Sequence, residues 1–172
     1  MNDQERFIRF EAEMLPLMND AYNLARWLVQ NDEEARDMVQ EAYLRAFKFF
    51  GGVRSDTGKP RVLRMVRNVR YDHLKKRQNH SPDCIHREER DPSNRPEEAL
   101  QSKLDIAAVR SALANLPEDF CTVLVLREME ELSYREISEI TQVPIGTVMS
   151  RLARGRQKLA EVLIEMRVSD LV

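Results

Sequence analysis

The 172-residue sequence predicts an all-α protein of two small helical domains joined by a flexible linker. Three observations lead to this fold class. Charged residues make up 33% of the chain and glycines number only 5, a balance that favours helices over strands and turns. Apolar residues recur at helical spacing on both sides of the middle of the chain. Between them lies a proline-containing, highly charged stretch with little apolar periodicity, which is typical of a linker.

The first domain is assigned to residues 1–77 and is expected to contain four helices. Their expected ranges are 4–17, 20–30, 32–50 and 59–77. Asn31 and Glu34 have the spacing of a capping box for the third helix. The apolar positions of that helix follow helical spacing and are predicted to be core: Val39, Tyr43, Ala46 and Phe50.

The fourth expected helix is strongly basic. Between residues 59 and 77 there are eight lysines and arginines and a single acid, Asp72. Backbone phosphates of a nucleic acid would account for four of the cations, namely Arg64, Arg67, Arg70 and Lys75. Asn68 adds a hydrogen-bonding group and Tyr71 a stacking plane, which together suit single-stranded DNA.

The linker is assigned to residues 78–96 and the second domain to residues 97–172. Helices are expected at 97–115, 117–130, 133–141 and 145–166. Pro117 starts the second of these, with Glu118 and Asp119 placed favourably at the positive end of its dipole. His80, Cys84 and His86 cluster loosely near the linker, but without a matched second pair they do not predict a metal site.

The last two expected helices form a helix-turn-helix. Ser133 and Glu136 have capping-box spacing, and Pro144 suits the first turn of the second helix. Ile137, Ile140 and Val148 are expected to be its buried contacts. The second helix carries small polar residues near its start, which can approach the edges of bases in a major groove. The cations that follow can contact backbone phosphates. Its candidate DNA-binding residues are Thr147, Ser150, Arg151, Arg154, Arg156 and Lys158. The simpler alternative is an amphipathic helix with a solvated basic face.

Other classes of protein are poorly supported by the sequence. Two cysteines make no disulfide framework, and a reducing cytoplasm is the expected location. No signal peptide and no apolar run long enough to cross a membrane is evident. No catalytic motif stands out, so neither an enzymatic activity nor a cofactor is expected.

Three segments carry a resemblance to a known family. They are DMVQEAYLRAF (37–47), MVRNVRYDHLKKR (65–77) and EISEITQVPIGTVMSRLARGR (136–156). The first two resemble region 2 of the sigma-70 family of bacterial transcription initiation factors, and the third resembles region 4. The run PIGTV followed by SRL is the most specific of these matches. The likeness is greatest to the small extracytoplasmic-function (ECF) group, and it covers both ends of the chain.

The resemblance implies roles for particular residues. Asp37, Gln40 and Glu41 match positions that dock on the clamp of the polymerase β′ subunit. Without the resemblance, the helix face that carries these three residues would be interpreted as a solvated surface. The loop 49–58 and the basic helix after it match the segment that opens the −10 element and holds a flipped base, although Phe49 and Phe50 could equally be core. The helix from Ile145 would read the −35 element. Core RNA polymerase, through its β′ clamp and β flap, promoter DNA and an anti-sigma factor are the implied partners.

Two positions depart from the family pattern. Arg61 stands where many relatives carry a tryptophan, so it must either reach outward or weaken the packing. Pro60 beside it is tolerable only if the helix starts there. Gln142 stands at a turn position usually held by glycine, where a positive φ is unfavourable.

Two alternative functions are consistent with parts of the sequence. One is a helix-turn-helix regulator that binds an operator without the polymerase, although residues 1–77 supply no evident dimerisation or sensing domain. The other is a sigma mimic that titrates an anti-sigma protein. A mimic is expected to have a degraded recognition helix, whereas here that helix is intact.

Overall fold

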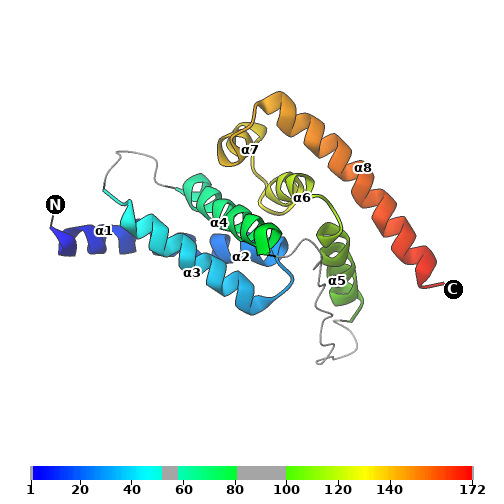
Figure 1. Cartoon of the computed structure of the whole chain (residues 1–172), viewed down its shortest axis with the longest axis horizontal. Coiled ribbons are helices and arrows are strands. Elements are labelled where there is room, and N and C mark those ends of the chain that lie inside the picture. The colour runs from blue at the N-terminus through cyan, green and yellow to red at the C-terminus, as the bar shows by residue number, and fades with distance from the viewer. Residues whose placement is uncertain (1, 52–57, 81–99, 172) are drawn as a thin grey trace.

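The computed structural model describes residues 2–51, 58–80 and 100–171, and all regular structure in those residues is helical (Figure 1). This confirms the predicted all-α class. The N-terminal elements are α1 (Asp3–Met14), the short 3-10 helix η1 (Leu15–Leu17), α2 (Met18–Leu28), α3 (Asp32–Lys48) and α4 (Lys59–His80). The C-terminal elements are α5 (Leu100–Ala114), α6 (Glu118–Leu124), the π-helix η2 (Val125–Met129), α7 (Tyr134–Thr141) and α8 (Ile145–Ser169).

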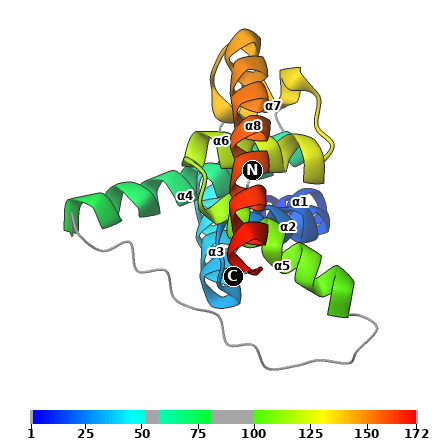
Figure 2. The same cartoon turned by 90° about the vertical axis from the view of Figure 1, so that its right-hand side faces the viewer.

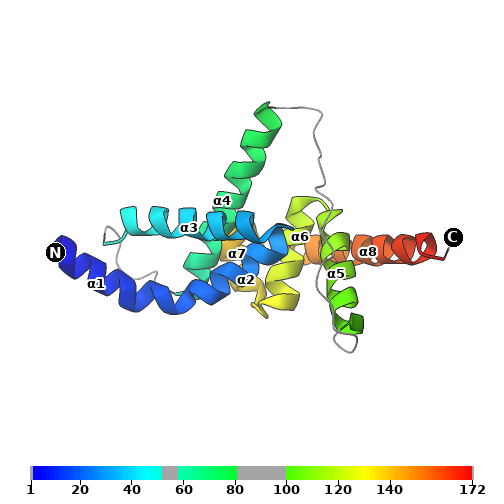
Figure 3. The ribbon, with the colours of Figure 1, turned by 90° about the horizontal axis from the view of Figure 1, so that it is seen from below.

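The largest differences from the expected helices lie in three places. Helix α4 continues to His80, so the expected linker begins inside a helix, and residues 81–96 of that linker lie outside the described part of the chain. The expected helix 117–130 is divided into α6 and η2, where the amide of Glu130 donates to the carbonyl of Val125. Helices α1 and α2 are separated only by η1, and Figure 3 shows them running in series past α3.

Side-chain caps are found at the starts of α1, α3 and α7. Ser133 and Glu136 form the predicted capping box of α7, each accepting from the other's backbone amide. The predicted box at Asn31 is only half right. Its side chain accepts from the amides of Glu33 and Glu34, but the Glu34 carboxylate turns to Arg77, 2.8 Å away. A charged partner is the stronger attraction for that carboxylate, so the cap stays one-sided.

The predicted core positions of the expected helix 32–50 and of the helix-turn-helix are all buried. Phe50 packs edge-on against Phe10 with ring centroids 5.3 Å apart, and the Tyr43 hydroxyl donates to the carbonyl of Met14. Gly155 of α8 allows the close approach of α6, because an added Cβ would come within 3.3 Å of Phe120 and of Leu124. Apolar burial of this kind is the main stabilising term in both halves of the chain.

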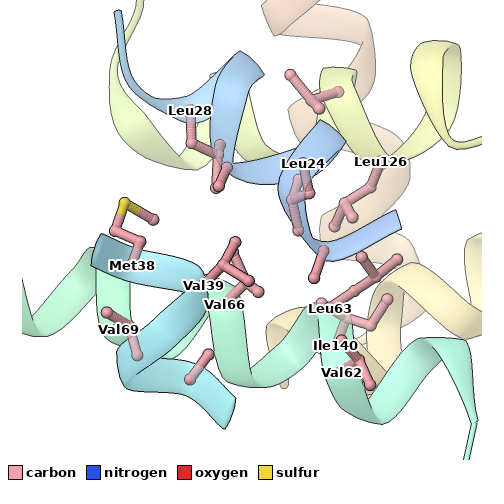
Figure 4. Close-up of a cluster of buried hydrophobic side chains, with 14 of the residues drawn as sticks. Leu24, Leu28, Met38, Val39, Val62, Leu63, Val66, Val69, Leu126 and Ile140 are labelled. Atoms are coloured by element: carbon pink, nitrogen blue, oxygen red, sulfur yellow. The ribbon is translucent and has the colours of Figure 1, made fainter. Parts of the chain in front are cut away.

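The two halves of the chain also pack against each other. Helix α4 contacts α7, and α2 contacts both η2 and α5 (Figures 1 and 2). Figure 4 shows Leu63 of α4 beside Ile140 of α7, and Leu24 of α2 beside Leu126 of η2. All four are buried and belong to one continuous apolar cluster. The sequence predicted two domains but not this shared core.

The two departures in sequence are accommodated differently. Helix α4 begins at Lys59, so Pro60 lies in its first turn, where a missing amide costs little. Arg61, in the same turn, is half-exposed, so its charge is not buried in the core. Gln142 adopts φ 57° and ψ 39°, the left-handed conformation that glycine would tolerate better.

Candidate nucleic-acid interface

Most of the candidate −10 residues share one face of α4. At about 100° per residue, Arg64, Arg67, Asn68, Tyr71 and Lys75 fall within an arc of about 100°. The opposite face carries Val62, Val66 and Val69, all of them buried. The apolar face packs the helix on its domain, and the cationic face lies on the other side of the helix, where Lys75 is exposed and the other four residues are half-buried.

Tyr71 lies at the middle of this face. The guanidinium of Arg67 lies over its ring at 3.9 Å from the centroid, and the Arg67 Nη1 donates to the side-chain oxygen of Asn68 at 3.3 Å. The Tyr71 hydroxyl donates to Asp119 of α6. Burial and this hydrogen bond both raise the pKa of Tyr71, so the hydroxyl stays a neutral donor.

Arg70 differs from the other candidates on α4. It lies about 60° beyond the arc, next to the apolar face, and only 13% of its side chain is exposed. Its Nε lies 3.4 Å from Glu118 Oε1 and its Nη1 lies 3.5 Å from Glu34 Oε1. Partial burial raises the pKa of Glu118, whereas the guanidinium of Arg70 opposes that shift. In this conformation Arg70 joins α3, α4 and α6 through ion pairs.

The predicted helix-turn-helix is formed by α7, a three-residue turn and α8. Ile137, Ile140 and Val148 are fully buried between the helices. The hydroxyl of Ser138 donates to the carbonyl of Val143 at 2.6 Å and ties α7 to the turn. Pro144 occupies the N-cap of α8 rather than its first turn, and no side chain caps that end.

Five of the six candidate −35 residues share one side of α8. Thr147, Ser150, Arg151, Arg154 and Lys158 fall within an arc of about 100°. Ser150, Arg154 and Lys158 are exposed, whereas Arg151 is 23% exposed and its Nη2 lies 3.5 Å from Asp119 Oδ2. Arg156 projects about 180° away from Thr147 and donates twice to Glu128, at 3.1 and 2.7 Å.

The candidate polymerase-docking residues lie together on α3. Asp37 and Gln40 are exposed. Glu41 is half-buried and accepts from Arg45, and its Oε2 lies 2.7 Å from Nε2 of His73 on α4. Asp37 also borders a shallow depression between α3 and the end of α4. Phe49, one of the two candidates near the flipped-base loop, is 64% exposed, whereas Phe50 is core. Residues 52–57 of that loop lie outside the description.

Sequence reasoning missed the contacts of Glu118 and Asp119. Acidic residues are favoured at the start of a helix, where the helix dipole is positive, and both residues lie at the start of α6. The sequence therefore gave no reason to expect that either carboxylate contacts another helix. In the structure, Glu118 lies beside Arg70 of α4. Asp119 contacts Tyr71 of α4 and Arg151 of α8.

Other classes of site find no support in the described part of the chain. No group of three metal-ligating side chains is found there, and Cys84 and His86 fall outside it. Of the helices described, none is long and apolar enough to cross a membrane.

Comparison with known proteins assigns the chain to a family. A family model described as "Sigma-70 region 2" matches residues 16–80, and one described as "Sigma-70, region 4" matches residues 106–159. The RNA polymerase sigma-H factor of Pseudomonas aeruginosa is 32% identical over 165 residues, covering 90% of this chain and 86% of that protein. The chain belongs to the ECF group of the sigma-70 family. Sigma factors are transcription initiation factors and not enzymes.

Further relatives agree with this assignment. The ECF RNA polymerase sigma-E factor of Haemophilus influenzae is 31% identical, covering 87% of this sigma factor and 81% of the relative. A solved structure of the sigma factor RpoE in complex with the anti-sigma factor NepR, from Bartonella quintana, superposes with a TM-score of 0.73. It covers 90% of this chain and 96% of that one at 24% identity, and therefore supports the fold.

Proposed function

We propose that this ECF sigma factor binds core RNA polymerase through α3 and recruits it to promoters that it reads with α4 and α8. The observation that carries the proposal is the placement of two cationic helix faces, one in each domain. Each face coincides with the segment that resembles the corresponding promoter-reading region of the family. The domain boundaries proposed from the sequence, 1–77 and 97–172, enclose most of the two family matches.

The two faces suit different forms of DNA. On α4 a tyrosine ring and an asparagine lie among arginines, which favours unpaired bases stacked and held along a phosphate backbone. On α8 small polar residues precede the cations, which favours insertion of the helix start into a major groove. We therefore assign −10 melting to α4 and −35 recognition to α8.

The polymerase partner is assigned to the acidic face of α3. Asp37, Gln40 and Glu41 fall within one arc of about 100°, and a cationic site on the β′ clamp would complement them. The second domain would contact the β flap. An anti-sigma partner is proposed on the precedent of the RpoE–NepR complex, which shares the fold. These partners place the protein in the cytoplasm.

Core binding and promoter-dependent transcription test this function together. A pull-down with core RNA polymerase, followed by run-off transcription, should show a stable complex and defined start sites. Asp37→Arg should weaken core binding by about tenfold, because it reverses a charge at the proposed interface. Glu11→Arg makes the same charge change at an exposed position of α1 and serves as the control. DNA binding without any core binding would instead support an operator-binding regulator.

A further inference from the structure

Helix α8 carries an apolar strip beside its candidate DNA-binding residues. The strip consists of Ile145, Met149 and Ala153, which follow one another by one turn and fall within an arc of about 80°. All three are exposed, and the two large side chains remain 44% (Ile145) and 52% (Met149) accessible to solvent. Packing in the core therefore does not account for the apolar character of this strip.

The buried residues of α8 define which face the helix can present to DNA. Val148, Leu152 and Gly155 are buried against the rest of the domain. Gly146 and Ser150 lie on the opposite face, and both are exposed. A Cβ added at Gly146 would meet no atom within 4 Å, so the surroundings of this first turn are open. This outward face is the one that would enter a major groove.

The two flanks of the outward face differ in chemistry. Arg151 lies on one flank, where a cation can meet phosphates or the acceptor edges of bases. Ile145 and Met149 lie on the other flank. Arg156 follows Met149 by two turns on the same side, but its guanidinium donates to Glu128. The second flank is thus apolar along the start of the helix, which is the part of a recognition helix that reaches base edges.

One group on the base edges of a major groove suits an apolar side chain. Guanine, adenine and cytosine present hydrogen-bond donors and acceptors there, whereas thymine adds a C5-methyl group. The side chain of Met149 is long, unbranched and polarisable, so it can adapt its shape to a methyl group. Ala153 is too short to reach as far, and Ile145 lies one turn before Met149 at the first residue of the helix.

We propose that Met149 reads the 5-methyl group of a thymine in the −35 element, and that Ile145 shields this contact from water. The inference rests on the function proposed above and adds an apolar contact to the polar base readout assigned to Arg151. The preferred −35 sequence should then contain a thymine whose methyl group, and not only its hydrogen-bonding edge, contributes to affinity. A protein-docking role for the strip would leave that methyl group without effect.

Replacement of thymine by deoxyuridine tests the contact directly, because the two nucleotides differ only in the 5-methyl group. The probe is a duplex carrying the −35 element of a promoter transcribed by the holoenzyme, in which each thymine of both strands is replaced in turn. The affinity of the holoenzyme for each duplex is measured at one salt concentration. One replacement should lower the affinity by about fourfold, the value expected for a single buried methyl group.

Met149→Ala completes a double-substitution cycle. Met149 is exposed, so its truncation leaves the core intact. The variant should bind the thymine duplex about fourfold more weakly than the parent does, and deoxyuridine should cost it no further affinity. Ile164→Ala truncates another exposed apolar residue of α8, about four turns away, and should keep the parent's ratio of thymine to deoxyuridine affinity. Arg151→Ala should weaken binding but keep the same ratio.

An equal ratio of thymine to deoxyuridine affinity in Met149→Ala and in the parent would overturn the inference. So would a parent protein that binds all of the duplexes equally, since the strip would then contact no methyl group. Failure of the holoenzyme to bind the −35 duplex at all would refute the proposed function and this inference with it. The two failures are therefore distinguishable.

Discussion

His73 of α4 lies with its Nε2 2.7 Å from Oε2 of Glu41 on α3, so one of the proposed polymerase-docking carboxylates is also a contact between helices. Arg45 donates to the same carboxylate and reaches Asp72 at 2.5 Å. Glu41 is thereby held at one orientation beside the more exposed Asp37 and Gln40. If this face docks on the polymerase as proposed, the network orients Glu41 before the partner arrives.

The first prediction concerns pH. Partial burial raises the pKa of the Glu41 carboxyl, but hydrogen bonds from His73 and Arg45 outweigh it, and the pKa falls below the ordinary 4.5. A lowered pKa contributes stability that is present above about pH 4.5 and is lost as pH falls through the folded value. Glu41→Gln should therefore lower the urea midpoint at pH 7, and the difference from the parent should shrink below pH 4.5. Glu11→Gln on α1 is the control, and a gap of constant size in acid would contradict the prediction.

The second prediction concerns the turn of the helix-turn-helix. Gln142 has φ 57°, a conformation that costs a side-chain-bearing residue more than it costs glycine. Gln142→Gly should raise the free energy of unfolding by about 0.5–1 kcal/mol. Gln157→Gly, in the middle of α8, should lower it by about 1 kcal/mol. Denaturant titration of both variants checks the prediction, and it fails if the two changes have the same sign.

Local features of the fold were predictable from the sequence because their signals are local. The capping box of Ser133 and Glu136, the helix start at Pro60 and the strained turn at Gln142 each depend on a few adjacent residues. The half-formed cap at Asn31 was not fully predictable. Its outcome depended on Arg77, more than 40 positions away, which attracts the Glu34 carboxylate.

The contact between the domains was beyond the reach of the sequence. Leu126 and Ile140 have the spacing of buried residues, but periodicity says only that a face is covered and not what covers it. Glu118 and Asp119 gave no further signal, since a helix start explains two acids without a second partner. Arg70 illustrates the same limit: its charge suggested a phosphate, whereas its position beside the apolar face gives it two carboxylates.

The third prediction concerns promoter melting. If a base stacks on the ring of Tyr71, Tyr71→Ala should reduce open-complex formation by about 1–3 kcal/mol and affect closed-complex binding less. Tyr22→Ala in α2 removes a tyrosine from the same domain, where the hydroxyl donates to Asp32, and serves as the control. Permanganate footprinting of the holoenzyme at a promoter measures the bubble. An unchanged bubble in Tyr71→Ala would leave the ring with a packing role only.

The fourth prediction separates two cations of α8 by their salt dependence. Lys158 is exposed on the side that carries Thr147, whereas Arg156 projects the opposite way and is bound to Glu128. Lys158→Ala should reduce the slope of log affinity against log salt by about one, because one phosphate contact is lost. Arg156→Ala should change the slope less and lower stability by about 0.2–1 kcal/mol. Titration of a −35 duplex by the holoenzyme at several salt concentrations measures both slopes, and equal losses would place Arg156 on a phosphate as well.

The fifth prediction concerns sequence readout by Arg151. It lies in the second turn of α8, within reach of base edges if the start of the helix enters a major groove. A bidentate contact between its guanidinium and a guanine would contribute about 1–3 kcal/mol of discrimination. Because Arg151 also lies 3.5 Å from Asp119, Arg151→Ala removes an intramolecular ion pair as well as the proposed DNA contact. Selection from randomised −35 sequences avoids this problem, since loss of the ion pair affects every DNA sequence alike. The variant should lose preference at a single base pair, whereas Lys158→Ala should keep the preferences of the parent. Identical selected sequences for the parent and Arg151→Ala would reduce Arg151 to one more phosphate contact.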